Sequence, residues 1–162
     1  MSILKVVLIV IAVLVVLFIL LLVYTLSPTI RDISKHEELK AFVEVPLIIR
    51  SPAFIYKSDK GSYRFHEYVL TQNEQYQSSM THELVIGSKV MLKKIKTYRS
   101  DGGAGFTDVF ALGEYIAPDG KKIEFEYIWG NIDPGLYSGI VEPLPGAPWQ
   151  DSTAAPIRVK RN

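Results

Sequence analysis

The hydrophobic and polar positions divide the chain into two unequal parts. From Val6 to Leu26 no residue carries a charge, and almost every side chain is Val, Ile or Leu. As a helix this run would be roughly 31 Å long at about 1.5 Å per residue, close to the roughly 30 Å hydrocarbon core of a bilayer. Backbone amides in lipid must be satisfied within the segment, which favours a helix. The pattern therefore predicts a short tail over residues 1–5 and a transmembrane helix over residues 6–26.

The alternative for this run is a cleaved signal peptide, because Lys5 precedes it. The apolar core of a signal peptide is typically about 7–15 residues, which is shorter than this run. Thr25-Leu26-Ser27 is a poor match to a small-x-small cleavage site. The chain has no cysteine, so anchoring through a lipid-modified cysteine is excluded. We expect an uncleaved signal anchor, and therefore a single-pass membrane protein with the lipid bilayer as partner of residues 6–26.

The side of the membrane is harder to derive from charge. Lys5 lies before the predicted span and Arg31 and Lys35 lie after it, so simple counting of basic residues favours a cytoplasmic domain. Long domains, however, cross the membrane largely regardless of charge, and the short N-terminal tail is typical of a signal anchor. We expect an extracytoplasmic domain on the periplasmic side of an inner membrane or its equivalent, and the cytoplasmic side stays open.

Residues 27–41 form a polar segment between the apolar run and the rest of the chain. Ser34 and Glu37 have the spacing of a capping box, which predicts a short helix that continues to about Phe42. We therefore interpret residues 27–41 as a linker with a short helix.

After residue 41 the pattern changes to that of β-structure. Residues 42–50 are rich in β-branched side chains, and Pro46 places this strand at a sheet edge or a bulge. Residues 54–57 and 62–70 predict a hairpin with glycine in its turn. Residues 71–81 are polar and predict the longest loop, a position that often carries binding surfaces.

The second half of this domain has clearer periodicity. In residues 89–99 the alternation shifts at Lys93-Lys94, which predicts a β-bulge. A turn at Pro118-Asp119-Gly120 then separates two strands. Apolar side chains alternate along the first of these strands at Phe106, Phe110, Leu112 and Ile116. They alternate along the second at Ile123, Phe125, Tyr127 and Trp129.

These elements predict a mainly β fold. Several short strands between glycine-containing turns over residues 42–130 are typical of a small antiparallel β-barrel or sandwich, with an SH3-like or oligonucleotide-fold-like barrel as the first expectation. Residues 131–162 are rich in proline and glycine, a composition that supports neither a helix nor an inner strand. We expect a Pro-rich extended C-terminal tail there.

Composition narrows the possible partners and cofactors. All 17 acidic residues and all but one of the 18 basic residues follow Leu26, so the domain is formally neutral and lacks the basic field that nucleic acid requires. Without cysteine there is neither a thiolate nucleophile nor a cysteine-type zinc site. The spacing of His36, His66 and His82 matches no metal motif. We therefore expect no nucleic acid, no metal and no cofactor.

The sequence contains no clear catalytic motif. Asp101-Gly-Gly-Ala-Gly105 lacks the Gly-Lys-Ser/Thr ending of a phosphate loop, and there is no Gly-x-Ser-x-Gly elbow. Glu124 and Glu126 share one strand face, as paired carboxylates of a hydrolase do. Charge pairing with the lysine-rich strand 89–99 is the simpler explanation. We expect no enzyme, and keep an enzyme that acts on an envelope polymer or lipid through Glu124 and Glu126 as the alternative.

Aromatic residues are the strongest candidates for binding. The chain has 9 tyrosines, 7 phenylalanines and 2 tryptophans, more than a small core needs. Exposed aromatics beside arginine are typical of protein-binding hot spots, whereas a core and its rim are the simpler interpretation. The candidate binding residues are Tyr98, Arg99, Phe106, Tyr115, Tyr127, Trp129, Tyr137 and Trp149. The segment Pro143–Trp149 is expected to dock on its own domain or, alternatively, in the groove of another protein.

These observations favour a membrane-anchored, non-catalytic binding module of the cell envelope that takes a protein partner. An assembly factor, an accessory subunit and an inhibitor or immunity-type protein all fit this description. A structural subunit of a larger membrane complex is a further alternative. The apolar run has no Gly-x-x-x-Gly and only Ala12 as a small residue, so its sequence gives no signal for tight helix dimerisation.

Overall fold

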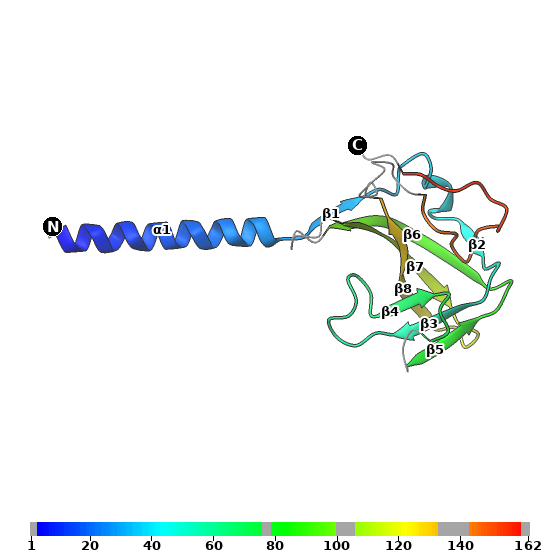
Figure 1. Cartoon of the computed structure of the whole chain (residues 1–162). Helices are drawn as coiled ribbons and strands as arrows, with labels where there is room; N and C mark the ends of the chain where they lie inside the picture. The colour runs from blue at the N-terminus through cyan, green and yellow to red at the C-terminus, as the bar shows by residue number, and fades with distance from the viewer. Residues whose placement is uncertain (1–2, 76–78, 100–105, 133–142, 160–162) are drawn as a thin grey trace.

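The N-terminal run forms one long helix that stands apart from the rest of the protein. The computed structural model describes residues 3–75, 79–99, 106–132 and 143–159. Helix α1 (Ile3–Leu26) has 24 residues, none of them buried against the domain, and it projects away from the β-rich part (Figure 1). It is long and apolar enough to cross a membrane. The predicted N-terminal apolar helix is thus confirmed.

The remaining elements build one mixed sheet of eight strands. In chain order these elements are β1 (Thr29–Asp32), the short 3-10 helix η1 (Lys40–Phe42), β2 (Pro46–Ile48), β3 (Ala53–Lys57), β4 (Tyr68–Thr71), β5 (Met80–Leu84), β6 (Lys89–Arg99), β7 (Thr107–Ile116) and β8 (Lys122–Asn131). The strands lie in the order β1-β6-β7-β8-β4-β3-β5, and β2 also pairs with β6. The fold is therefore mainly β, as predicted.

The sheet differs from the predicted antiparallel barrel in two respects. Strands β4 and β8 run parallel, with Val69 opposite Glu126, whereas the other strand pairs are antiparallel. The sheet also does not close, because β5 at one end of the order does not pair with β1 or β2 at the other. The parallel pair joins segments far apart in the sequence, so no turn signal announces it.

The three longest strands follow the predicted pattern most closely. The register of β6 against β7 shifts between Leu92 and Lys94, which confirms the bulge at Lys93. The turn before β8 is confirmed by the hydrogen bond from the Gly120 amide to the Ala117 carbonyl at 2.8 Å. Gly120 adopts a φ of 82°, which glycine tolerates without strain.

Alternation is confirmed on β8 but not on β7. The predicted β8 positions from Ile123 to Trp129 are all buried. On β7 the predicted positions lie on the face turned away from the main core, which takes Val109, Ala111 and Tyr115 from the other face of the strand. As a result Phe106 and Ile116, predicted on the apolar face, are more than half exposed.

Residues after α1 join the sheet at once. β1 pairs with β6, from Thr29 opposite Arg99 to Asp32 opposite Lys96. The predicted capping box at Ser34 is wrong, because the Ser34 hydroxyl accepts a hydrogen bond from the Ile95 amide at 2.9 Å. The residues after β1 form hydrogen-bonded turns and then η1, which ends at Phe42, where the predicted short helix also ends.

The hydrophobic core lies between the sheet and the C-terminal segment. Leu144, Ala147, Trp149 and Val159 are all buried in it, and the Leu144 amide bonds the Ile157 carbonyl at 2.8 Å. The described part of residues 131–162 therefore packs on its own domain. This agrees with the expected self-docking of Pro143–Trp149.

Candidate functional site

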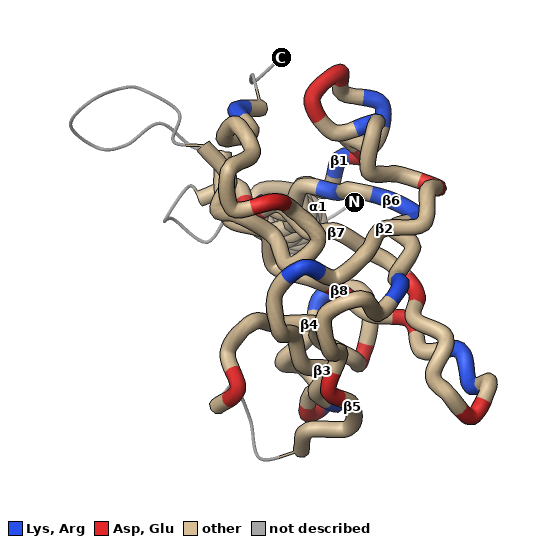
Figure 2. Tube along the Cα trace, turned by 90° about the vertical axis from the view of Figure 1, so that its right-hand side faces the viewer, with Lys and Arg blue, Asp and Glu red and all other residues tan. Residues whose placement is uncertain are grey.

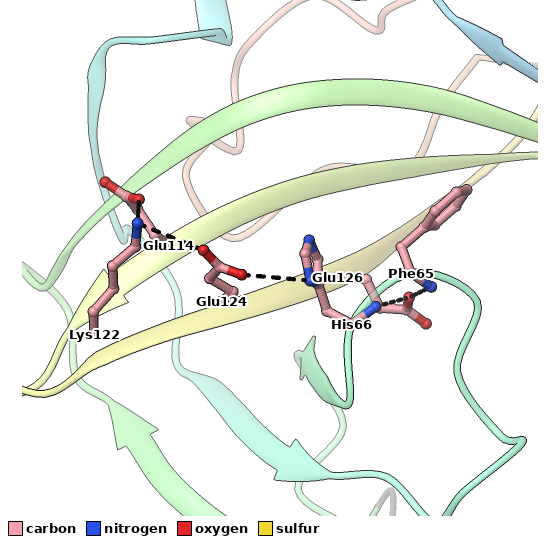
Figure 3. A network of polar contacts seen from close by, with 6 residues as sticks. All are labelled: Phe65, His66, Glu114, Lys122, Glu124 and Glu126. Atoms are coloured by element: carbon pink, nitrogen blue, oxygen red, sulfur yellow. Dashed lines mark hydrogen bonds and ion pairs between the residues drawn. The ribbon is translucent and has the colours of Figure 1, made fainter.

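Strand β8 carries the two carboxylates that the sequence offered as a catalytic pair, and their environments differ. Glu126 is 1% exposed, whereas the Glu124 side chain is 59% exposed. Figure 3 shows both beside the loop that connects β3 to β4, with His66 between them. One strand thus presents a buried acid and a solvated acid two residues apart.

The Glu126 carboxylate is held by consecutive backbone amides of that loop. Its Oε2 accepts hydrogen bonds from the amides of Phe65 at 2.6 Å and His66 at 3.0 Å. The Arg64 amide lies 3.1 Å from Oε1 and 3.2 Å from Oε2. A carboxylate with both oxygens engaged and no access to solvent fixes the loop on the sheet, and this geometry leaves no oxygen free for acid–base work.

Glu124 belongs to a surface ion-pair chain. Its oxygens lie 3.5 Å from Lys122 Nζ and 3.9 Å from His66 Nδ1. Lys122 Nζ also lies 2.7 Å from Glu114, which in turn lies 3.1 Å from Lys93 (Figure 3). The hydrogen bond from Lys122 is the main cause that lowers the pKa of the Glu114 carboxyl, and Glu114 raises the pKa of Lys122.

The observed ion pairs correct the predicted partner of the lysine-rich strand. β7 lies between β6 and β8, so Lys93 pairs with Glu114 of β7 instead of Glu124 or Glu126. Among the described residues, no group of three His, Asp or Glu side chains is arranged to hold a metal ion. The polar network is therefore best explained as support for the loop and the sheet surface.

Four of the eight predicted binding residues lie in the core, and all four are aromatic. Tyr115, Tyr127, Trp129 and Trp149 are at most 8% exposed. Trp149 packs edge-to-face on Tyr127 and Trp129, with ring centroids 5.0 and 5.3 Å apart. Burial raises the pKa of Tyr127 to about 12. These four side chains fill the interior instead of presenting a surface.

Three other candidates, Tyr98, Arg99 and Phe106, lie at or just after the C-terminal end of β6. Tyr98 is half-buried beside Phe65 and Phe110, and the Arg64 guanidinium lies 5.2 Å from its ring centroid. Arg99 is also half-buried. Phe106 is 52% exposed. Tyr137 lies outside the described residues.

An exposed aliphatic surface that the sequence interpretation missed lies at the opposite end of β6. Val45 precedes β2, Ile48 is its last residue, and Val85 and Ile86 precede β6. Their exposed fractions are 38%, 49%, 63% and 65%. We call these four residues the distal rim. The signal was available in the sequence, because Val85-Ile86-Gly87 places two aliphatic residues in a turn, where polar residues are usual.

Backbone hydrogen bonds hold the two segments of the distal rim together. The Ile49 amide bonds the Ser88 carbonyl at 2.8 Å, and the Gly87 amide bonds the Ile49 carbonyl at 2.8 Å. Gly87 has a φ of 97°, which favours glycine in this turn. The rim is therefore part of the folded sheet, with its side chains presented from a fixed backbone.

Comparison with known proteins adds no functional information. No protein-family model, no curated protein and no solved structure matches this chain. Function is therefore argued from the geometry alone.

Proposed function

We propose that this protein is a single-pass membrane-anchored, non-catalytic binding module of the cell envelope that docks a protein partner through its distal rim. The observation that carries the proposal is the position of the rim: α1 joins the domain beside β1, and β2 lies at the opposite side (Figure 1). An anchor that crosses the bilayer would thus present Val45, Ile48, Val85 and Ile86 away from the membrane.

Exposure of these side chains favours a protein as the occupant. Single exposed aliphatic residues are common, but several on hydrogen-bonded neighbouring segments form a patch of the kind that marks interaction sites. Lipid is an implausible occupant of the end far from α1, so an apolar protein surface is the fitting ligand. Tethering raises the local concentration of such a module near other membrane proteins.

The placement of the domain belongs to the same proposal. We place residues 27–162 on the extracytoplasmic side, since long domains cross the membrane largely regardless of their charge. The SH3-like or oligonucleotide-fold-like topology stays a prediction, as does the extended character of the whole C-terminal tail. Burial of Glu126 makes the alternative enzyme less favourable, because that carboxylate is out of reach of a substrate.

Site-specific photo-crosslinking tests the proposal. A photoreactive amino acid at position 86 of the full chain, expressed in its own membrane, is expected to give one discrete protein adduct. The matched control is position 121, an exposed residue in the turn before β8. Adducts that are absent at position 86, or identical at both positions, would overturn the proposed docking surface. A compartment-dependent reporter after Asn162 tests the side of the membrane separately.

A further inference from the structure

We propose that the end of the domain next to α1 rests on the anionic headgroups of the bilayer. This inference depends on the membrane anchor of the proposed function but not on its protein partner. We define the headgroup face by apolar and basic side chains near the β1–β6 pair, all of them exposed except the half-buried Lys96. These side chains are Ile30, Arg31, Lys94, Lys96 and Phe106.

The tether between α1 and this face is short. Only Ser27 and Pro28 separate the end of α1 from β1. The three steps from Leu26 to Thr29 span at most about 11 Å, at 3.3–3.6 Å each. β1 is itself fixed to β6 over four paired positions. The tether therefore keeps the Arg99 end of β6 close to a leaflet that α1 crosses.

The charge of the face suits an anionic surface. β1 and the second half of β6 carry Arg31, Lys94, Lys96 and Arg99, and Figure 2 shows blue Lys and Arg segments on both strands. Among the described residues of β1, β6 and β7 at this end, the acidic ones are Asp32 and Asp108, which lies opposite Tyr98. In this described part basic residues therefore outnumber acidic ones. Each basic residue near a charged leaflet adds about fivefold to binding.

Apolar side chains at the same end complete the fit to lipid. Phe106 is 52% exposed and precedes Thr107, the residue paired with Arg99 at the end of β6. Ile30 of β1 is 48% exposed. Aromatic and aliphatic side chains between basic residues are typical of surfaces that lie in the headgroup region.

The aromatic cluster behind this face gives it a rigid base. Lys96 Nζ lies 5.0 Å from the ring centroid of Phe65, and Phe65 packs on Phe110 at 5.3 Å. The loop that carries Phe65 is in turn fixed by Glu126. Lys96 therefore keeps its position at the membrane end without a carboxylate partner in this contact.

Fluorescence quenching by lipid in nanodiscs tests the inference on the full chain. The sequence has no cysteine, so one cysteine can be labelled uniquely. A dye at Asn131→Cys reports the membrane end of β8, and a dye at Lys121→Cys reports the other end of the same strand. Nanodiscs contain headgroup-labelled quencher lipid in neutral phosphatidylcholine, with or without about one-third phosphatidylglycerol. Extraction at alkaline pH first checks that α1 is embedded.

Docking predicts stronger quenching at position 131 in anionic than in neutral lipid, reversed by about 0.5 M salt, with little change at position 121. Arg31→Gln and Lys94→Gln should each lower the docked-to-undocked ratio about fivefold. Lys89→Gln, the same change at the far end of β6, should leave it unchanged. Equal quenching in both lipids, or equal effects of the three variants, would overturn the inference. Failure of α1 to stay in the membrane would instead overturn the anchor itself.

Discussion

The buried carboxylate of Glu126 offers the sharpest test of how this fold is held together. Glu126→Gln keeps the side-chain shape and removes the charge that faces the amides of Arg64, Phe65 and His66. The glutamine oxygen can take the place of Oε2 and still accept from Phe65 and His66. Its NH2 group takes the place of Oε1, so the Arg64 amide loses the contact at 3.1 Å and keeps the one at 3.2 Å with the oxygen.

The magnitude follows from these three contacts. A hydrogen bond to a charged acceptor is worth about 1.5–3 kcal/mol and a neutral one about 0.5–1.5 kcal/mol. Three weakened bonds, each losing about 1–1.5 kcal/mol, would amount to about 3–4.5 kcal/mol. Removal of a buried charge returns part of this through lower desolvation. We expect a net loss of about 2 kcal/mol in the free energy of unfolding.

Urea denaturation of the full chain in detergent measures this loss, with the fluorescence of the buried Trp129 and Trp149 as the signal. Hydrogen exchange should also be faster at the amides of residues 64–66. Glu124→Gln is the matched control, because the Glu124 side chain is 59% exposed and exposed ion pairs contribute about 0–1 kcal/mol. Equal stability of the two variants, with unchanged exchange at residues 64–66, would refute the role given to Glu126.

Three further changes test the core and the sheet. Trp149→Ala empties the position packed on Trp129 and should cost about 3–5 kcal/mol in urea denaturation. Gly113→Ala should cost about 1–3 kcal/mol, because a Cβ there would meet the Met91 carbonyl oxygen at 2.8 Å. For Tyr127, the pKa is about 12 when folded and about 10 as its ordinary value, so stability should fall as pH rises from about 10 to about 12. Tyr127→Phe should remove that part of the pH dependence.

Each of these has a control and a contrary outcome. Gly146→Ala should be nearly neutral, since no atom lies within 4 Å of the added Cβ; an equal loss at both glycines would contradict the close approach at Gly113. Trp149→Ala with unchanged stability would show that the C-terminal segment does not complete the core. An ultraviolet titration that shows the Tyr127 phenol ionising near pH 10 in the folded protein would contradict its burial.

The elements that the sequence predicted best are those whose cause is local. The bulge at Lys93 and the turn at Gly120 depend on neighbouring residues, and the alternation from Ile123 to Trp129 follows from the two-residue period of a strand with one buried face. The β7 prediction chose the wrong face, because β7 is buried on both faces and the main core lies against Val109, Ala111 and Tyr115. No pattern in the sequence distinguished that strand from a regular one.

The candidate site was predicted less well, because burial is a property of the assembled sheet. Glu124 and Glu126 both alternate with apolar residues on β8, so the sequence does not distinguish them. In the structure the loop at Arg64–His66 covers only Glu126. Trp129 and Trp149 are two of the aromatics expected on a binding face, but they pack on each other inside the domain. Composition identified the aromatic surplus and could not tell a core residue from a surface residue.

The sequence by itself determined the apolar helix, the mainly β character and the local turns, since length, period and turn chemistry act over a few residues. Only the tertiary structure decided that residues 29–32 join the sheet, that β4 and β8 run parallel, and which charges are buried. These features depend on contacts between segments that are far apart in the sequence. No local pattern of residues indicates which of those segments will meet. The positions of the headgroup face beside α1 and of the distal rim far from it likewise depend on contacts between distant segments.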